Sequence, residues 1–209
     1  MLLSWFNRSV FLPKRSSYRH RKTLILFLSG AGGWVMFDKR LIAELNSQGF
    51  DVLGMNTLRY FLWRARSPEE LTAVIQSQLQ IWMPLWRDES LVMIGYSQGA
   101  DVLPFVTARL HPAWRNRTKC LVLLGPARHA DFHLRLRDVI CNSYSSNALA
   151  LEPELKSIGP QLPVLCIAGE KDPNASWWLN CRLVPGSHIF RHNAPEISRM
   201  IQDEIESVT

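Results

Sequence analysis

A serine between two glycines has the setting of a catalytic residue. Gly95-Tyr96-Ser97-Gln98-Gly99 matches the pattern Gly-x-Ser-x-Gly, in which the serine hydroxyl is a nucleophile. An apolar strand-like run over residues 91–94 precedes this motif, and a helical pattern over residues 98–110 follows it. This is the strand-turn-helix setting of a nucleophile elbow, where glycines let a strained turn close. We therefore predict that Ser97 is the nucleophile and that it attacks an ester-type bond.

A serine hydroxyl is a poor nucleophile near neutral pH, so it needs a base and a carboxylate that orients the base. The chain order expected for this kind of site is serine, acid, histidine. His188 lies just before the last helical pattern, and Asp172 follows the fifth apolar run. We predict His188 as the base and Asp172 as the acid. Glu170, two residues before Asp172, is the alternative acid.

The tetrahedral intermediate of acyl transfer needs backbone N–H donors. Two positions suit this role: Gln98, directly after the nucleophile, and Ala31, in the glycine-rich loop that follows the first strand. The same loop begins the dinucleotide-binding pattern Gly-x-Gly-x-x-Gly, but Val35 stands where the third glycine belongs. We therefore expect an oxyanion hole here, and no cofactor.

Strand-length apolar runs alternate with helical patterns along the chain. We expect strands at 23–28, 51–55, 90–94, 119–124 and 164–168, with helices at 37–48, 67–84, 98–110 and 194–208. Such alternation predicts the α/β class, here an α/β-hydrolase fold with a mainly parallel central sheet, flanking helices and a minimal cap or none. Phe132, Leu134 and Leu136 alternate with charged or basic residues, which predicts a half-exposed strand or extended segment. Residues 143–163 favour loops with one short helix, and whether 126–160 form a lid stays open.

The composition is that of one globular domain. The chain has 209 residues, of which 47% are hydrophobic and 20% are charged, so a disordered or fibrous protein is excluded. We predict a basic and apolar N-terminal segment over residues 1–22 and a single hydrolase domain over residues 23–209. The oligomeric state is left open.

The formal net charge of +6 predicts attraction to anionic partners. No nucleic-acid motif accompanies the basic residues, so we expect no nucleic-acid partner. The N-terminal residues mix apolar and polar types in a way that does not fit a signal peptide. Peripheral contact of this segment with anionic lipid and packing of it against the domain are the two alternatives.

Four cysteines, at positions 120, 141, 166 and 181, show neither Cys-x-x-Cys spacing nor the density of a disulfide scaffold. This usage suits a reducing compartment, and we expect Cys120 and Cys166 to be free thiols in the core. The predicted location is the cytoplasm or the periphery of the inner membrane. No metal site is recognisable.

With these motifs the chain resembles the bacterial AcvB/VirJ virulence-protein family, whose members resemble small α/β-hydrolases. The resemblance covers most of the chain and rests on residues 29–34, 58–61, 95–105 and 185–188. It implies hydrolysis of aminoacylated phosphatidylglycerol, notably the lysyl form, and allows a periplasmic location.

For such a substrate we expect Arg59 to contact a lipid phosphate and Tyr60 to line an apolar approach, with packing of Tyr60 beneath a loop as the alternative. The predicted function is thus a serine hydrolase of aminoacyl-phospholipid esters. A soluble carboxylesterase or thioesterase of the same fold is the first alternative. A non-catalytic hydrolase-like module that binds lipid or protein is the second.

Overall fold

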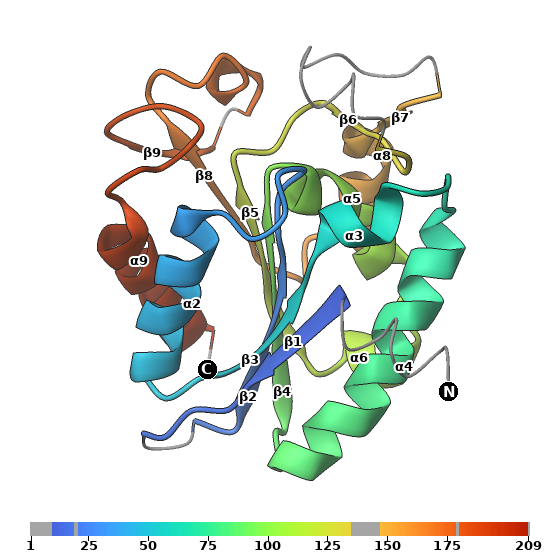
Figure 1. The fold of residues 1–209 in the computed structure, drawn as a ribbon, viewed down its shortest axis with the longest axis vertical. Coiled ribbons are helices and arrows are strands. Elements are labelled where there is room, and N and C mark those ends of the chain that lie inside the picture. The colour runs from blue at the N-terminus through green and yellow to red at the C-terminus, as the bar shows by residue number, and fades with distance from the viewer. Residues whose placement is uncertain (1–9, 19–20, 135–146, 179, 209) are drawn as a thin grey trace.

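A seven-stranded sheet forms the centre of the molecule (Figure 1). The computed structural model describes residues 10–18, 21–134, 147–178 and 180–208. The strand order is β1-β3-β2-β4-β5-β8-β9, and every neighbouring pair is parallel except β1 with β3. The strands are β1 (Phe11–Lys14), β2 (Thr23–Leu28), β3 (Asp51–Met55), β4 (Ser90–Tyr96), β5 (Thr118–Leu124), β8 (Val164–Gly169) and β9 (Arg182–Val184). The predicted α/β class and mainly parallel sheet are confirmed.

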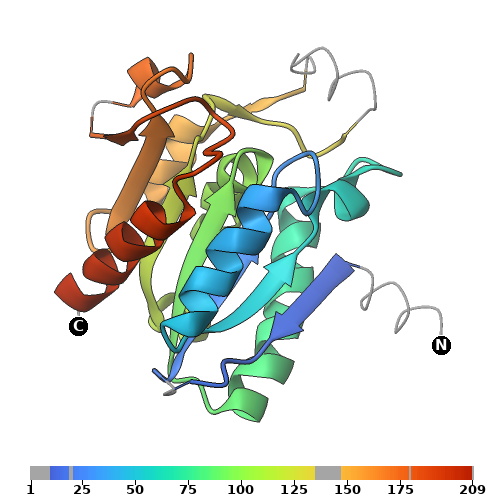
Figure 2. The same ribbon diagram turned by 60° about the vertical axis from the view of Figure 1, so that its left-hand side comes forward.

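Helices cover both faces of this sheet (Figure 2). One face carries α2 (Met36–Ser47) and α9 (Ala194–Ser207), and the other carries α4 (Pro68–Trp86), α5 (Gln98–Ala108) and α8 (Leu151–Ile158). The shorter elements are α3 (Thr57–Phe61), α6 (Pro112–Arg115), the 3-10 helix η1 (Ala175–Trp177), and β6 (His129–Ala130) paired with β7 (Leu149–Ala150). Each of the five strands and four helices predicted from apolar runs and helical spacing is present, with ends that differ by a few residues.

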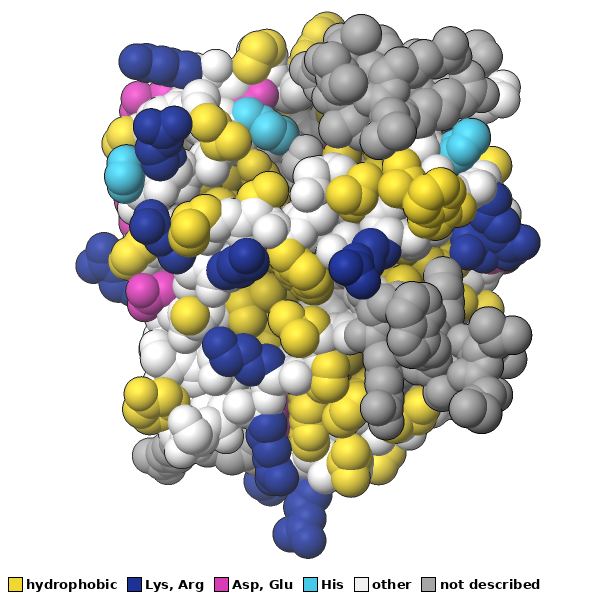
Figure 3. Space-filling model, in the orientation of Figure 1, with side chains coloured by type: hydrophobic (Ala, Val, Ile, Leu, Met, Phe, Trp, Pro, Cys, Tyr) yellow, Lys and Arg dark blue, Asp and Glu magenta, His cyan; other side chains and the backbone are white. Residues whose placement is uncertain are grey.

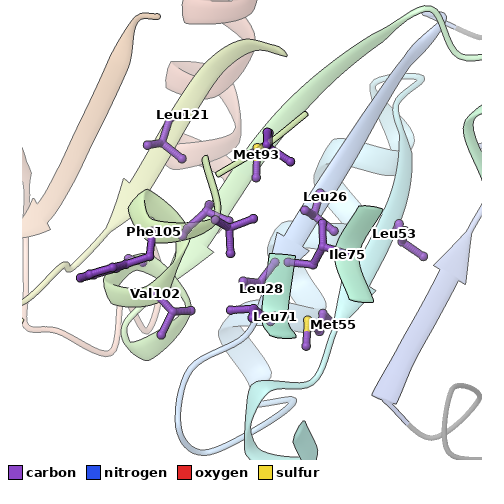
Figure 4. Close-up of a cluster of buried hydrophobic side chains, with 14 of the residues drawn as sticks. Leu26, Leu28, Leu53, Met55, Leu71, Ile75, Met93, Val102, Phe105 and Leu121 are labelled. Atoms are coloured by element: carbon purple, nitrogen blue, oxygen red, sulfur yellow. The ribbon is translucent and has the colours of Figure 1, made fainter. Parts of the chain in front are cut away.

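The strand β2 shows why continuous apolar runs give this architecture. All six of its residues are buried. Because successive side chains of a strand point to opposite faces, Leu24, Leu26 and Leu28 enter the core beneath α4 and α5, whereas Ile25 and Phe27 enter the core beneath α2 and α9. Figure 4 shows the first of these cores, where Leu71 and Ile75 of α4 lie against the strands.

Local sequence signals explain how α4 begins. Ser67 Oγ accepts a hydrogen bond from the Glu70 amide at 3.1 Å, and the Ser67 amide donates to Glu70 Oε2 at 3.0 Å. Pro68 occupies the first turn, where no amide hydrogen is required. The helix was expected to end at Pro84 but continues to Trp86, so the one amide donor that Pro84 lacks does not end the helix at that residue.

Two short edge strands were not predicted. Residues 11–14, which the sequence placed in the N-terminal segment, form β1 and pair with β3, so the sheet extends into that segment. Three residues form β9 at the other edge. Short edge strands carry little periodicity; β1 has one buried residue in four and contains Pro13, which edge strands tolerate. Of the two alternatives for the N-terminal residues, lipid contact and packing against the domain, Val10 and Phe11 show packing, since both are buried. Residues 1–9 lie outside the described residues.

Residues 129–134 differ from the expected half-exposed strand. The strand of this region is β6, and Phe132 and Leu134 lie in the core at 8% and 6% exposure. Their burial follows from packing beside α3 and α5, since the Phe132 ring contacts the rings of Phe61 and Phe105. Leu136 and much of the possible lid at 126–160 lie outside the described residues. The short helix expected within 143–163 is α8.

A disulfide joins Cys166 in β8 to Cys181, which lies directly before β9. The expectation that Cys166 is a free core thiol is therefore wrong, whereas Cys120 is free and buried as expected. Spacing in the sequence could not reveal this pair, because the parallel pairing of β8 with β9 brings the two residues together. Cys141 lies outside the described residues.

Candidate active site

Ser97 occupies a sharp turn between β4 and α5. Its φ of 51° is in a region that residues with a side chain rarely adopt. Gly95 and Gly99 make the turn possible, since a Cβ on Gly95 would overlap the Gly99 backbone and one on Gly99 would overlap the Leu28 carbonyl. The Ser97 amide donates to the Leu124 carbonyl at 2.8 Å, which fixes the turn to β5. The predicted nucleophile elbow is thus present in its geometry.

The structure brings Ser97, His188 and Asp172 together. The Oγ atom of Ser97 lies 2.9 Å from His188 Nε2, and His188 Nδ1 lies 2.6 Å from Asp172 Oδ2. His188 lies in the loop between β9 and α9, and Asp172 lies in the loop after β8. Because β4, β8 and β9 are parallel, their carboxyl ends meet at one edge of the sheet. A hydroxyl, an imidazole and a carboxylate in this sequence can move a proton from the serine.

The carboxylate of Asp172 contacts His188 and is almost fully buried, since the Asp172 side chain is 1% exposed. Burial alone would raise the pKa of Asp172, but hydrogen bonds from His188 and from the Asn174 amide at 2.9 Å outweigh it, so the pKa lies below its ordinary value. The alternative acid, Glu170, is exposed, and its amide donates to the Val184 carbonyl. The structure therefore places Asp172, and not Glu170, beside the imidazole.

The two positions predicted for the oxyanion hole flank Ser97. Gln98 is the first residue of α5, so its amide has no intrahelical partner. Ala31 follows Gly30, which packs so closely that an added Cβ would lie 3.2 Å from Ser97 Cβ. Thr57 holds this loop from behind, since its Oγ1 lies 2.8 Å from the carbonyl oxygens of both Ser29 and Gly30. Gln98 and the loop of Gly30 and Ala31 thus lie next to Ser97, and their role as an oxyanion hole stays a prediction.

Two residues that shape the site were missed in the sequence. Tyr96 Oη donates to the His188 carbonyl at 3.2 Å, and the two rings stack with centroids 5.7 Å apart. Gly125, with a φ of 60°, leaves room for the imidazole, because a Cβ there would lie 2.9 Å from His188 Cε1. Tyr96 stands inside the elbow motif, but nothing in the motif indicates a contact with a residue 92 positions later.

A buried carboxyl fixes the loop that contains Gly125. Asp101 Oδ1 in α5 accepts a hydrogen bond from the Ala127 amide at 2.7 Å. Burial raises the pKa of Asp101 well above its usual value, and the nearby Asp172 charge adds to this. The raised pKa favours the neutral form of Asp101, whereas the lowered pKa of Asp172 favours its charged form beside His188.

The predicted substrate contacts Arg59 and Tyr60 have different positions. Arg59 is exposed on α3, whose first turn is fixed by a hydrogen bond from the Arg59 amide to Asn56 Oδ1 at 3.0 Å. Tyr60 is 1% exposed. Its ring packs edge-on against Phe61, and the Arg66 guanidinium lies 4.6 Å above it. Tyr60 is thus packed in the interior, which was the alternative prediction, and does not line an apolar path to the site.

No group of His, Cys, Asp and Glu side chains within the described part of the chain is arranged to hold a metal ion. Among the helices of that part, none has the length and apolar character needed to cross a bilayer.

Comparisons with known proteins agree with this fold. Residues 22–208 match the model of a family described as bacterial virulence protein (VirJ). A search of curated proteins finds no match.

Similar solved structures include a carboxyl esterase from Bacillus coagulans, with a TM-score of 0.65 and 12% identity over 95% of this chain and 93% of that one. The esterase domain of a Rhodothermus marinus protein has a TM-score of 0.64 and 13% identity over 94% and 92% of the chains. A monoacylglycerol lipase from Paleococcus ferrophilus has a TM-score of 0.58 and 15% identity over 95% and 98%. At these identities the likeness shows the α/β-hydrolase fold.

Proposed function

Because the chain belongs to the VirJ family of bacterial virulence proteins, as its motifs indicate, we propose that it is a serine hydrolase that cleaves an ester bond. The observation that supports this most directly is the continuous path from Ser97 Oγ through His188 to Asp172, with contacts of 2.9 and 2.6 Å. Two backbone amides beside Ser97 complete the set of groups that acyl transfer requires.

In the proposed reaction, His188 Nε2 takes the proton of Ser97 as the serine oxygen attacks the ester carbonyl. The amides of Ala31 and Gln98 stabilise the negative oxygen that forms. His188 then gives the proton to the leaving alcohol, and water releases the acyl group from Ser97 with His188 again as the base. Asp172 keeps the other ring nitrogen protonated and stabilises the imidazolium.

The substrate class that we propose is an aminoacyl ester of phosphatidylglycerol, with the lysyl ester as the first case. Family resemblance supports this choice. The lysyl ester itself has a net positive charge, so the surplus of basic residues would attract the anionic lipids that surround it in the bilayer. Arg59 is the proposed phosphate contact, because α3 adjoins the loop that carries Ala31 through the Thr57 hydrogen bonds. Replacing Arg59 by Ala should then raise KM for the lipid, and unchanged kinetics would exclude this contact.

We further propose a periplasmic location. The Cys166–Cys181 disulfide supports it, because structural disulfides persist in oxidising compartments and are rare in the cytosol. Cell fractionation followed by thiol alkylation and mass analysis tests this. A protein recovered from the cytoplasmic fraction with both thiols alkylated would contradict it.

Two assays test the proposed reaction in turn. Intact-mass analysis after treatment with a fluorophosphonate should show one adduct on the parent and none on Ser97→Ala or His188→Ala. Vesicles that contain lysyl-phosphatidylglycerol should then release lysine with the parent and not with Ser97→Ala. A labelled parent that hydrolyses only short soluble esters would favour a soluble esterase, and a folded parent without any adduct would favour a binding module.

A further inference from the structure

Large apolar side chains are exposed on the loops around Ser97. Met36, Trp63, Leu149, Trp177 and Ile189 have exposed fractions from 42% to 84%. Each lies in a segment that follows the carboxyl end of a parallel strand, which is the edge of the sheet that holds Ser97. Single exposed apolar residues are ordinary on a protein surface, whereas several around one site indicate a contact surface. We call these five residues the apolar rim.

Contacts between the loops hold two rim residues near the base. Met36 and Ile189 precede Phe37 and Phe190, whose rings are 5.1 Å apart. The Arg40 guanidinium also joins α2 to the loop after His188, since it donates to the Arg191 carbonyl at 3.3 Å. Met36 and Ile189 are thus held on neighbouring loops, and Ile189 directly follows the catalytic base that we propose.

Other contacts fix the remaining rim residues. Trp63, at 84% exposure, lies in the turn between α3 and α4. The Arg66 amide, three residues later, donates to the Phe132 carbonyl at 2.9 Å and ties this turn to the segment that follows β6. Leu149 belongs to β7, which pairs with β6. The guanidinium carbon of Arg128 lies 4.0 Å from the centroid of the Trp177 ring, so a positive charge lies directly beside this exposed ring.

Positive charge accompanies the apolar rim. The described loops at this edge of the sheet, together with α3, contain more basic than acidic side chains: Arg59, Arg64, Arg66, Arg128, Lys171 and Arg191 against Asp131, Glu170 and the buried Asp172. Arg64 also pairs with Glu70, in the first turn of α4, at 2.6 Å. Figure 3 views the molecule from the side, with this edge of the sheet at the top; hydrophobic and basic side chains lie among each other over the face that it shows. Exposed tryptophan and aliphatic side chains among arginines suit the headgroup region of an anionic bilayer.

We propose that the apolar rim is a membrane-docking surface, through which the protein binds an anionic lipid bilayer with Ser97 facing the lipid. Rim side chains enter the headgroup region, and the basic residues contact lipid phosphates. This proposal rests on the proposed function in one respect: an orientation with Ser97 toward the bilayer is useful only if the substrate is a lipid ester. A lipid held in the bilayer then reaches Ser97 without leaving the membrane.

The test measures binding separately from hydrolysis, in the Ser97→Ala background so that no lipid is consumed. Sedimentation with vesicles of phosphatidylglycerol and phosphatidylcholine is compared with vesicles of phosphatidylcholine alone. We expect binding to the anionic vesicles only, and weaker binding at raised salt. Trp63→Ala together with Met36→Ala should weaken binding about tenfold or more, as loss of one to two buried apolar side chains predicts.

Ile81→Ala and Leu85→Ala are matched controls, since these residues of α4 are 54% and 61% exposed and do not belong to the rim. They should leave vesicle binding unchanged, and thermal melting should show that all variants are folded. The proposal is overturned if the rim variants bind as tightly as the parent or if the parent binds no vesicle. In either case, turnover of a soluble ester would still support the proposed hydrolase. Vesicle binding by a protein that forms no fluorophosphonate adduct would support membrane docking and contradict the proposed hydrolase.

Discussion

Tyr96 contacts His188 twice, once through the hydrogen bond from its phenol to the His188 carbonyl at 3.2 Å and once through the stacked rings. The residue before the proposed nucleophile therefore positions the proposed base. The Tyr96 ring is itself held by Phe37 and Phe190, whose ring centroids lie 5.0 and 6.0 Å from it. The orientation of the imidazole is thus set by the core as well as by Asp172.

Tyr96→Phe should lower kcat on a soluble ester by about fivefold, which corresponds to the loss of one hydrogen bond, while KM changes little. Tyr96→Leu, which also removes the stacking, should have a larger effect. The control is Tyr18→Phe, because Tyr18 is 62% exposed. Equal kcat values for the parent and Tyr96→Phe would show that the hydrogen bond does not position His188.

Asp172→Asn should reduce kcat about ten-thousandfold with a modest change in KM, because an amide cannot hold the productive imidazole tautomer. Glu170→Gln, two residues away and exposed, should retain the parent activity. Steady-state kinetics on one soluble ester compares the two. A large loss with Glu170→Gln and a small one with Asp172→Asn would reverse the assignment of the acid.

Gly125→Ala should reduce kcat by about a hundredfold, because the new methyl group displaces the imidazole. Gly159→Ala is a matched control: both glycines have positive φ, at 60° and 82°, but a Cβ on Gly159 meets nothing within 4 Å. Both variants should lose stability through backbone strain, by about 1–3 kcal/mol. Denaturant titration and kinetics separate the effects, and equal activity losses in the two variants would contradict a specific contact with His188.

Asp38 should make the protein less stable above neutral pH. Burial raises the pKa of Asp38 from 3.8 to about 7, so between these values the folded state binds a proton that the unfolded state does not. Stability is therefore lost as pH rises from the unfolded pKa to the folded pKa, by at most about 4 kcal/mol. Asp38→Asn should be more stable than the parent at about pH 8 and similar to it at about pH 4.

Urea unfolding of both proteins at the two pH values measures this difference. The lowered pKa of Asp172 acts in another window, because it removes stability only as pH falls below about 4. A parent and Asp38→Asn with the same pH profile would show that Asp38 does not titrate in the folded state near neutral pH.

The sequence was informative where a local pattern decides the structure. The apolar run of β2 and the Ser67–Glu70 capping box needed only neighbouring residues, and so did the elbow at Ser97. Chain order then placed Asp172 and His188 correctly at the sheet edge, because parallel strands put their following loops on one side. The hydrolase fold and the three proposed catalytic positions could be predicted for these reasons.

The remaining features depend on contacts between distant residues. The Cys166–Cys181 disulfide required the pairing of β8 with β9, and β9 is too short to leave a pattern. The burial of Tyr60 required its packing against Phe61 and Arg66. The space that Gly125 leaves for His188 could not be predicted, because it depends on how two loops that are distant in the sequence lie against each other. No single segment of the chain carries that information.

The late position of β9 has a consequence for synthesis of the protein. Ser97 is held by β4, β5 and α5, whereas His188 comes 91 residues later and follows the last strand. A nascent chain that has emerged only as far as α8 contains the serine in its turn without any imidazole beside it. By the proposed mechanism, hydrolysis therefore requires synthesis of the chain through β9 and the loop after it, and fragments that end before His188 would lack the proposed base and be inert toward the esters of the cell that makes them.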